Sequence, residues 1–145
     1  MSTKIVVGLD GHGPDNRAVG YASHLAKLIG DCEIILVYVI EWSPFTFQTP
    51  EENEQRHKRR EEEISLANER VITPAVKALA DTGQPARGIV RHGDVAERLE
   101  AIAQEEGADQ IVVARTSDKS LSTRIFGSST ANLVMHSKLP VTVVG

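Results

Sequence analysis

The sequence predicts an α/β protein built on a five-stranded parallel sheet with helices on both faces. Short β-branched runs, such as Ile5-Val6-Val7 and Ile111-Val112-Val113, lack polar alternation and are typical of strands buried on both faces. Segments with apolar residues at helical spacing separate these runs, which gives the order β-α-β-α-β-α-β-α-β. That alternation favours right-handed crossovers within one sheet. The 145 residues show no repeat and no linker, so we expect one domain over residues 1–145.

The five strands are expected at residues 4–9, 33–40, 87–91, 110–114 and 140–144. Helices are expected after each of the first four. The first has Ala18, Ala22 and Leu25 on one face and ends at Gly30, and the helix that starts near Val95 ends at Gly107. The last helix is expected at about residues 128–137.

Residues 41–79 have two characters. Two prolines interrupt residues 42–50, and a charge-balanced run over 51–63 predicts the solvated start of a helix. The prolines and this charged run together suggest a flap over the end of the second strand. An apolar helical face follows from Ile64 to Leu79, and Thr73-Pro74 within it predicts a kink, or a restart with Thr73 as the cap.

Composition narrows the class of protein. A net charge of -4 argues against a broad nucleic-acid surface. The lone Cys32 cannot form an internal disulfide and reads as a small core residue in a reducing compartment. No apolar run approaches the roughly 20 residues of a membrane span, and the chain enters a strand directly, so we expect no signal peptide and a cytoplasmic protein.

The stretch 110–130 is the strongest candidate for a binding site. A buried strand leads into small and polar residues, and Gly127-Ser128-Ser129-Thr130 then predicts a helix N-terminus. Free N–H groups at such a terminus can hold a phosphate. An ordinary strand–loop–helix connection is the alternative. The other strand-end loops, at 10–14, 39–43 and 92–94, are further candidates because ligands bind at the carboxyl ends of parallel strands.

Several common sites are missing from the sequence. The phosphate loop that ends in Lys-Ser/Thr and the dinucleotide fingerprint are absent, as are a Ser-His-Asp order and a nucleophile elbow. The five histidines have no metal-ligand spacing. A phosphoacceptor receiver domain would need an acidic pair after the first strand and a Lys after the last one, and neither is found. Asp10 alone fits either a ribose contact or a turn.

The chain resembles the universal stress protein family over essentially its whole length. The matching pieces are Ile-Val-Val-Gly-Leu-Asp10-Gly11, Leu36-Val-Tyr-Val39, Arg91-His-Gly93-Asp94, Ala108-Asp-Gln-Ile-Val-Val113, Gly127-Ser128 and Leu139-Pro-Val-Thr-Val-Val144. Their order and spacing are together specific. The resemblance implies a Rossmann-like fold of the adenine nucleotide alpha hydrolase-like kind, with strand order 3-2-1-4-5, and a cytoplasmic role in the stress response.

The resemblance also implies a nucleotide site. The family's binding members carry Gly-x-x-Gly, nine residues, then Gly-Ser/Thr, and on this chain the pattern falls at Ala114, Ser117 and Gly127-Ser128. The first two glycines are replaced, so weak binding of ATP or another adenine nucleotide is expected, with Mg²⁺ only if ATP binds. Asp10 and Val39 would lie at the ribose and adenine, and Gly93 would form the pocket floor. The expected cofactor-binding residues are Leu9, Asp10, Val39, Gly93, Ala114, Arg115, Ser117, Gly127, Ser128 and Ser129.

Three functions follow as hypotheses. The first is a nucleotide-binding regulatory module, expected to be a homodimer that pairs through the C-terminal strand 140–144. The second is a dimeric interaction module of the same fold that binds no nucleotide. The third is a slow ATPase, which is the weakest because no positioned base or carboxylate cluster accompanies the loop. No catalytic residue, metal site, nucleic-acid partner or membrane partner is expected.

Overall fold

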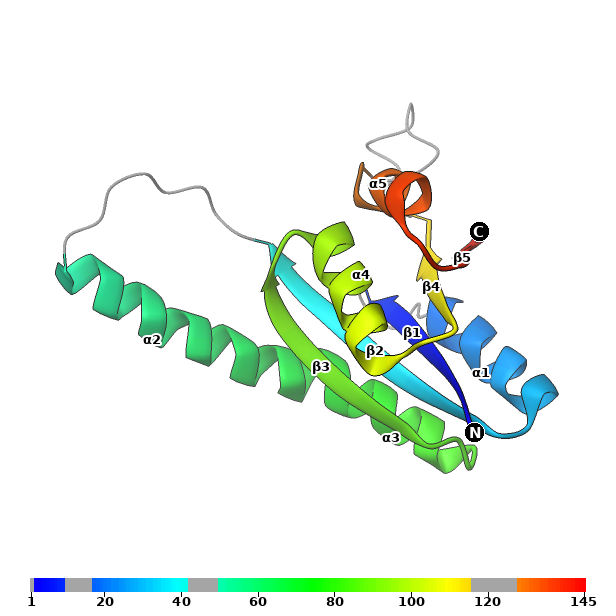
Figure 1. The fold of residues 1–145 in the computed structure, drawn as a ribbon. Helices are drawn as coiled ribbons and strands as arrows, with labels where there is room; N and C mark the ends of the chain where they lie inside the picture. The colour runs from blue at the N-terminus through cyan, green and yellow to red at the C-terminus, as the bar shows by residue number, and fades with distance from the viewer. Residues whose placement is uncertain (1, 10–16, 42–49, 116–127) are drawn as a thin grey trace.

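The computed structural model describes residues 2–9, 17–41, 50–115 and 128–145. Within them the strands form one parallel sheet of order β3-β2-β1-β4-β5 (Figure 1). The strands are β1 (Thr3–Leu9), β2 (Cys32–Glu41), β3 (Ala86–Gly93), β4 (Gln110–Ala114) and β5 (Val141–Val144). The predicted fold class and strand order are confirmed, and β3 is longer than expected because it includes His92 and Gly93.

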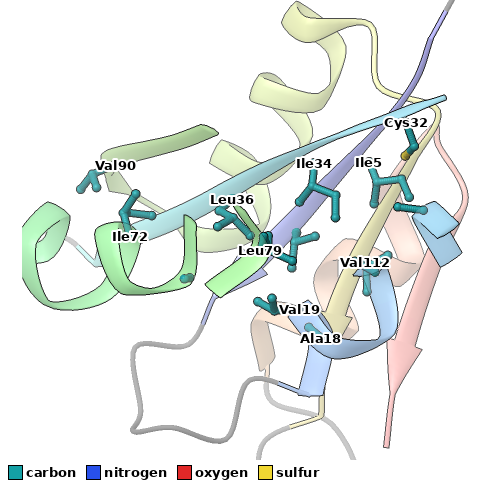
Figure 2. Close-up of a cluster of buried hydrophobic side chains, with 14 of the residues drawn as sticks. Ile5, Ala18, Val19, Cys32, Ile34, Leu36, Ile72, Leu79, Val90 and Val112 are labelled. Atoms are coloured by element: carbon teal, nitrogen blue, oxygen red, sulfur yellow. The ribbon is translucent and has the colours of Figure 1, made fainter. Parts of the chain in front are cut away.

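Helices cover both faces of the sheet, as Figure 1 shows. They are α1 (Arg17–Ile29), α2 (Pro50–Ala67), the π-helix η1 (Asn68–Ile72), α3 (Thr73–Asp81), α4 (Val95–Glu106) and α5 (Ser128–His136). On one face, α1, η1 and α3 bury residues such as Ile5, Leu36 and Ile72 (Figure 2). On the other, α4 and α5 pack over residues such as Val6 and Val113. Alternate side chains of each buried strand therefore point to opposite faces of the sheet and belong to two separate cores.

The helical connection from Pro50 to Asp81 is continuous and passes through η1. The Thr73 N–H donates to the carbonyl of Asn68, the five-residue spacing of a π-turn. Proline at position 74 has no N–H to give, and the widened turn before it accommodates the missing bond. The role predicted for Thr73 as a cap is wrong: Ile72 holds the cap position with helical dihedral angles and without a side-chain cap bond.

The first part of α2 is solvated, as its charge pattern predicts. No described side chain of α2 is buried before Ala67, and Figure 1 shows this end of the helix extending beyond the sheet. His57 Nε2 lies 3.3 Å from Glu61 Oε1 on its surface. Since Pro50 begins a regular helix, the flap suggested for residues 41–63 is helical from that point, while residues 42–49 lie outside the described part.

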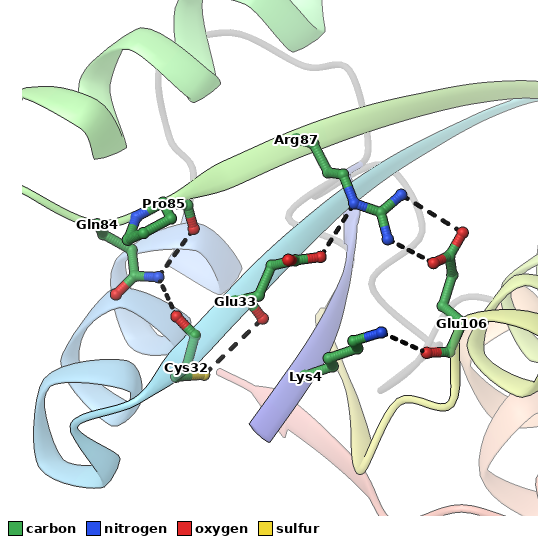
Figure 3. A network of polar contacts seen from close by, with 7 residues as sticks. All are labelled: Lys4, Cys32, Glu33, Gln84, Pro85, Arg87 and Glu106. Carbon is green, nitrogen blue, oxygen red and sulfur yellow. Dashed lines mark hydrogen bonds and ion pairs between the residues drawn. The ribbon is translucent and has the colours of Figure 1, made fainter. Parts of the chain in front are cut away.

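A polar network joins the amino ends of three strands, at the end of the sheet opposite the candidate site (Figure 3). Arg87 of β3 donates from Nε to Glu33 Oε1 of β2 at 2.9 Å, and its other nitrogens bond the carboxylate of Glu106 at the end of α4. Lys4 Nζ donates to the Glu106 carbonyl at 3.1 Å. These contacts join three strands to α4, so the network is structural.

Cys32 lies in the core at 6% exposure and is a free thiol, as expected from the sequence. Burial, followed by the nearby carboxylates, raises the pKa of this thiol. Among the described helices, none has both the length and the apolar character that crossing a membrane requires.

Candidate functional site

The carboxyl ends of β1 and β4 lie side by side at the centre of the sheet. Val7 pairs with Val112, and two residues further on the strands end at Leu9 and Ala114. To one side of this pair lie β2 and β3, and to the other lies β5. The direction of strand addition therefore reverses between β1 and β4, which is where open α/β sheets bind ligands.

The side chains of three predicted site residues belong to the two cores. Leu9 and Ala114 are half-buried and pack toward the α1 face. Val39 is 7% exposed and packs on the α4 face. Tyr38 pairs with Leu9, so Val39 lies one residue beyond the last paired residue of β1. Any contact of Val39 with a ligand at this edge would therefore come from its backbone.

Gly93 lies farther away, at the end of β3. It pairs with Glu41, and β2 and β1 separate its strand from β4, a spacing of about 14 Å for three strand intervals. Its φ of 143° is a value that residues with a Cβ rarely adopt. Asp94 then caps α4, because its Oδ2 accepts from the Glu97 N–H at 3.0 Å. Gly93 therefore lies on the β3 side of the sheet, three strands away from β4.

His92, next to Gly93 at the end of β3, contacts α2. Its side chain is 11% exposed, and Nε2 lies 3.0 Å from Oε2 of Glu63. The contact links the solvated part of α2 to the end of β3, and the spacing of 29 residues gave no sign of it in the sequence.

Two arginines meet at the end of β4. Arg17, the first residue of α1, donates from Nη2 to the Arg115 carbonyl at 2.9 Å. The Arg115 N–H donates to the Val144 carbonyl at 2.8 Å, which continues the ladder to β5. The Arg115 guanidinium lies against Gly145, where an added Cβ would come within 2.9 Å of Nη2. The predicted residue Arg115 therefore faces β5, and Arg17 is a residue that the sequence patterns missed.

The N-terminus of α5 is at Ser128, where the sequence predicts a helix start. Ser129 is half-buried, and Leu133 anchors the helix in the core on the α4 face. The first N–H groups of a helix lack partners within the helix and carry partial positive charge. This end of α5 can therefore contribute to holding an anion.

Asp10, Ser117 and Gly127 lie outside the described residues, so the predicted site is described only in part. Across the ranges that the structure describes, no group of three or more His, Cys, Asp or Glu residues could hold a metal ion. The described portion contains two arginines, the backbone at the ends of two strands and a helix N-terminus, which are groups that can bind an anion.

Comparison with known proteins gives consistent matches. The model of the universal stress protein family matches residues 1–145. Universal stress protein G of Shigella flexneri is 38% identical over 55 residues, which cover 38% of this chain and 38% of that protein, so the match spans well under half of the relative's length. The structure of universal stress protein UspA from Lactobacillus plantarum has a TM-score of 0.82 at 21% identity, over 99% of this chain and 97% of that chain. A family structure from Burkholderia pseudomallei has a TM-score of 0.67 at 27% identity, over 98% and 95% of the two chains.

Two further structures of this fold carry adenine nucleotides. One is a universal stress protein in complex with cAMP, at 24% identity and a TM-score of 0.61, over 99% of this chain and 96% of that chain. The other is an Arabidopsis thaliana family protein with AMP bound, at 18% identity and a TM-score of 0.63, over 98% and 90%. At these identities the likeness shows the fold. Since the family match extends over the whole chain and the sheet has the order that the resemblance implies, the chain belongs to the universal stress protein family.

Proposed function

We propose that this chain is a cytoplasmic regulatory module of the stress response that binds an adenine nucleotide weakly at the carboxyl ends of β1 and β4. The observation that carries the proposal is the placement of Leu9 beside Ala114 at the reversal point of the sheet. The N-terminus of α5 supplies a phosphate-binding element next in the chain. The AMP and cAMP held by family structures support adenine nucleotides as the ligand class.

Two opposing effects set the expected affinity. The helix N-terminus at Ser128-Ser129 offers N–H groups whose hydrogen bonds to a charged phosphate contribute about 1.5–3 kcal/mol each. Ser117 carries a Cβ where binding members have glycine, which costs about 1 kcal/mol if positive φ is needed. Ala114 is extended at the end of β4, so its Cβ opposes binding only by limiting how closely a phosphate approaches the backbone. Asp118 follows Ser117 in the sequence, and we expect its negative charge to oppose the binding of phosphates. A total penalty of about 2–3 kcal/mol would lower the affinity for ATP by a factor of roughly 30 to 150.

Calorimetry with AMP, ADP and ATP tests this function. We expect ADP and AMP to bind nearly as well as ATP, and Mg²⁺ to matter only for ATP. The double variant Ala114→Gly/Ser117→Gly should tighten ATP more than AMP. Ala80→Gly, an exposed alanine of α3, is the matched control and should change neither affinity. Tight ATP binding by the parent, or no gain in the double variant, would contradict this account of the loop.

The two other functions have distinct outcomes. An interaction module that binds no nucleotide would release none on denaturation, so mass spectrometry of the freshly purified protein separates it from the leading proposal. A slow ATPase would show turnover above that of a variant changed at Asp10 and Ser128. We rank hydrolysis last because the sequence offers no positioned base beside the loop.

We also propose that two copies pair through β5. This strand lies at the sheet edge, and its four residues are all half-buried. Val141 and Val143 pack on the α4 face while Val144 packs on the other, as alternation predicts. A half-buried apolar edge favours pairing with another strand.

Light scattering at micromolar concentration tests the dimer. The parent should have twice the chain mass, and Val143→Glu should give the single-chain mass with an unchanged circular dichroism spectrum. Leu66→Glu, at an exposed apolar position of α2, is the control and should leave the mass unchanged. A parent that is monomeric at this concentration refutes the dimer.

The cytoplasmic part of the proposal rests on the free, buried thiol of Cys32, which fits a reducing compartment. Cell fractionation tests it. Recovery of the protein outside the cytoplasmic fraction would contradict it.

A further inference from the structure

Arg17 connects two parts of the chain that are 98 residues apart. It begins α1, its side chain is half-buried, and its Nη2 lies 2.9 Å from the carbonyl oxygen of Arg115. A guanidinium that donates to a carbonyl forms a charge-assisted hydrogen bond, which is stronger and more directional than a neutral one. The contact therefore fixes the orientation of the peptide that follows β4.

The same peptide is also fixed from the other side. The Arg115 N–H donates to Val144 of β5 at 2.8 Å, and the Arg115 guanidinium packs against Gly145. Arg115 directly follows β4 and is thus bonded to both α1 and β5.

We propose that Arg17 is a positioning residue for the phosphate end of the bound nucleotide, acting through the Arg115 carbonyl. This inference rests on the proposed nucleotide site, which begins at Ala114. An unneutralised carbonyl oxygen at that point would present partial negative charge to a phosphate. The guanidinium of Arg17 offsets this charge and holds the carbonyl in one orientation, so the effect grows with the charge of the ligand.

A purely structural role for Arg17 makes a different prediction. If Arg17 only held α1 to β4, its loss would lower the affinities for adenosine, AMP and ATP by the same factor. A positioning role for phosphate predicts a selective loss for AMP and ATP. The comparison of these three ligands therefore separates the two roles.

The experiment measures affinities of adenosine, AMP and ATP for the parent, Arg17→Gln and Arg17→Lys, by ligand-observed NMR or calorimetry. Arg17→Gln should weaken AMP and ATP by roughly tenfold or more while adenosine changes by less than about twofold. Arg17→Lys keeps the charge and one donor and should recover most of the loss. Arg70→Gln, an exposed arginine of η1 on the β3 side, removes the same charge and should change none of the affinities.

The outcomes that overturn the inference are distinct from failure of the nucleotide site itself. Nucleotide binding by the parent that is equally strong in Arg17→Gln refutes the role of Arg17 alone. An equal loss for adenosine and ATP assigns Arg17 to structure and also refutes it. A parent that binds no adenine nucleotide refutes the proposed function, and this inference with it.

Discussion

Ile72 of η1 occupies the space that a side chain on Gly88 of β3 would need. A Cβ built on Gly88 would overlap Ile72 Cγ2 and come within 3.3 Å of Ile72 Cβ. Ile72 is 5% exposed and belongs to the core on the α1 face. The π-turn at Asn68–Ile72 therefore presses a branched side chain directly onto the backbone of β3.

Gly88→Ala should lower the free energy of unfolding by about 1–3 kcal/mol, because a branched side chain cannot move aside without disturbing its neighbours. Chemical denaturation measures the change. Gly20→Ala is the matched control: a Cβ there meets nothing within 4 Å, and replacing an exposed helical glycine should stabilise by about 0.5–1 kcal/mol. In an Ile72→Ala background the Gly88→Ala change should cost less, and additive costs would refute the contact.

Arg87→Met should lower the free energy of unfolding by at most about 1 kcal/mol, because the Arg87 side chain is 45% exposed and water screens its ion pairs. The hydrogen bond from Arg87 holds the pKa of Glu106 below its usual range. Its contribution is therefore present at neutral pH and is lost as the pH falls through that lowered pKa. Thermal melts from about pH 7 to about pH 3 should show the difference between parent and variant shrinking with acid. A difference that grows with acid would contradict this sign.

Glu100 of α4 holds the turn that leads into β5. Burial acts to raise the pKa of Glu100, but hydrogen bonds from the Ser137 hydroxyl, the Lys138 N–H and Gln104 outweigh it and hold the pKa below its ordinary value. Ser137→Ala should therefore raise this pKa, as carboxyl NMR titration can measure. Lys27→Ala, at the exposed end of α1, serves as the control and should leave the titration unchanged.

Asp94→Ala should destabilise the protein by about 1 kcal/mol, because the N–H of Glu97 loses its cap. Asp94→Asn keeps an acceptor oxygen and should retain most of the stability. Denaturant midpoints of the three proteins decide the matter, and equal midpoints for parent and Asp94→Ala would rule out a capping role.

Residue patterns predicted most of the fold because its strands are buried on both faces. Runs such as Ile5-Val6-Val7 admit few other structures, and the family resemblance supplied the strand order. The π-turn escaped prediction because Thr73-Pro74 alone is compatible with a kink, a restart or a wider turn. The contact between Ile72 and Gly88, which bridges the helix and β3, is a tertiary feature that no local pattern contains.

Only those parts of the candidate site that are ends of strands or helices could be predicted from the sequence. The strand ends at Leu9 and Ala114 and the helix start at Ser128 lie where the sequence places them. The contact of Arg17 with Arg115 joins residues 98 apart, and an arginine in a first helical turn looks like any solvated residue. Gly93 was expected in the loop after a strand that ends at Arg91, but it is the last residue of β3, and its distance from β4 depends on the sheet order.

The solvated part of α2 has a consequence for how the molecule opens. A helical segment without a buried side chain gains little stability from packing, and an isolated helix shorter than about 12–15 residues is marginal in water. The amides of residues 51–62 should therefore exchange with deuterium at a free energy far below that of β1 and β4, as a separate unit of local unfolding. The contact between Glu63 and His92 ties α2 to the end of β3, so we expect the boundary of that unit to lie there.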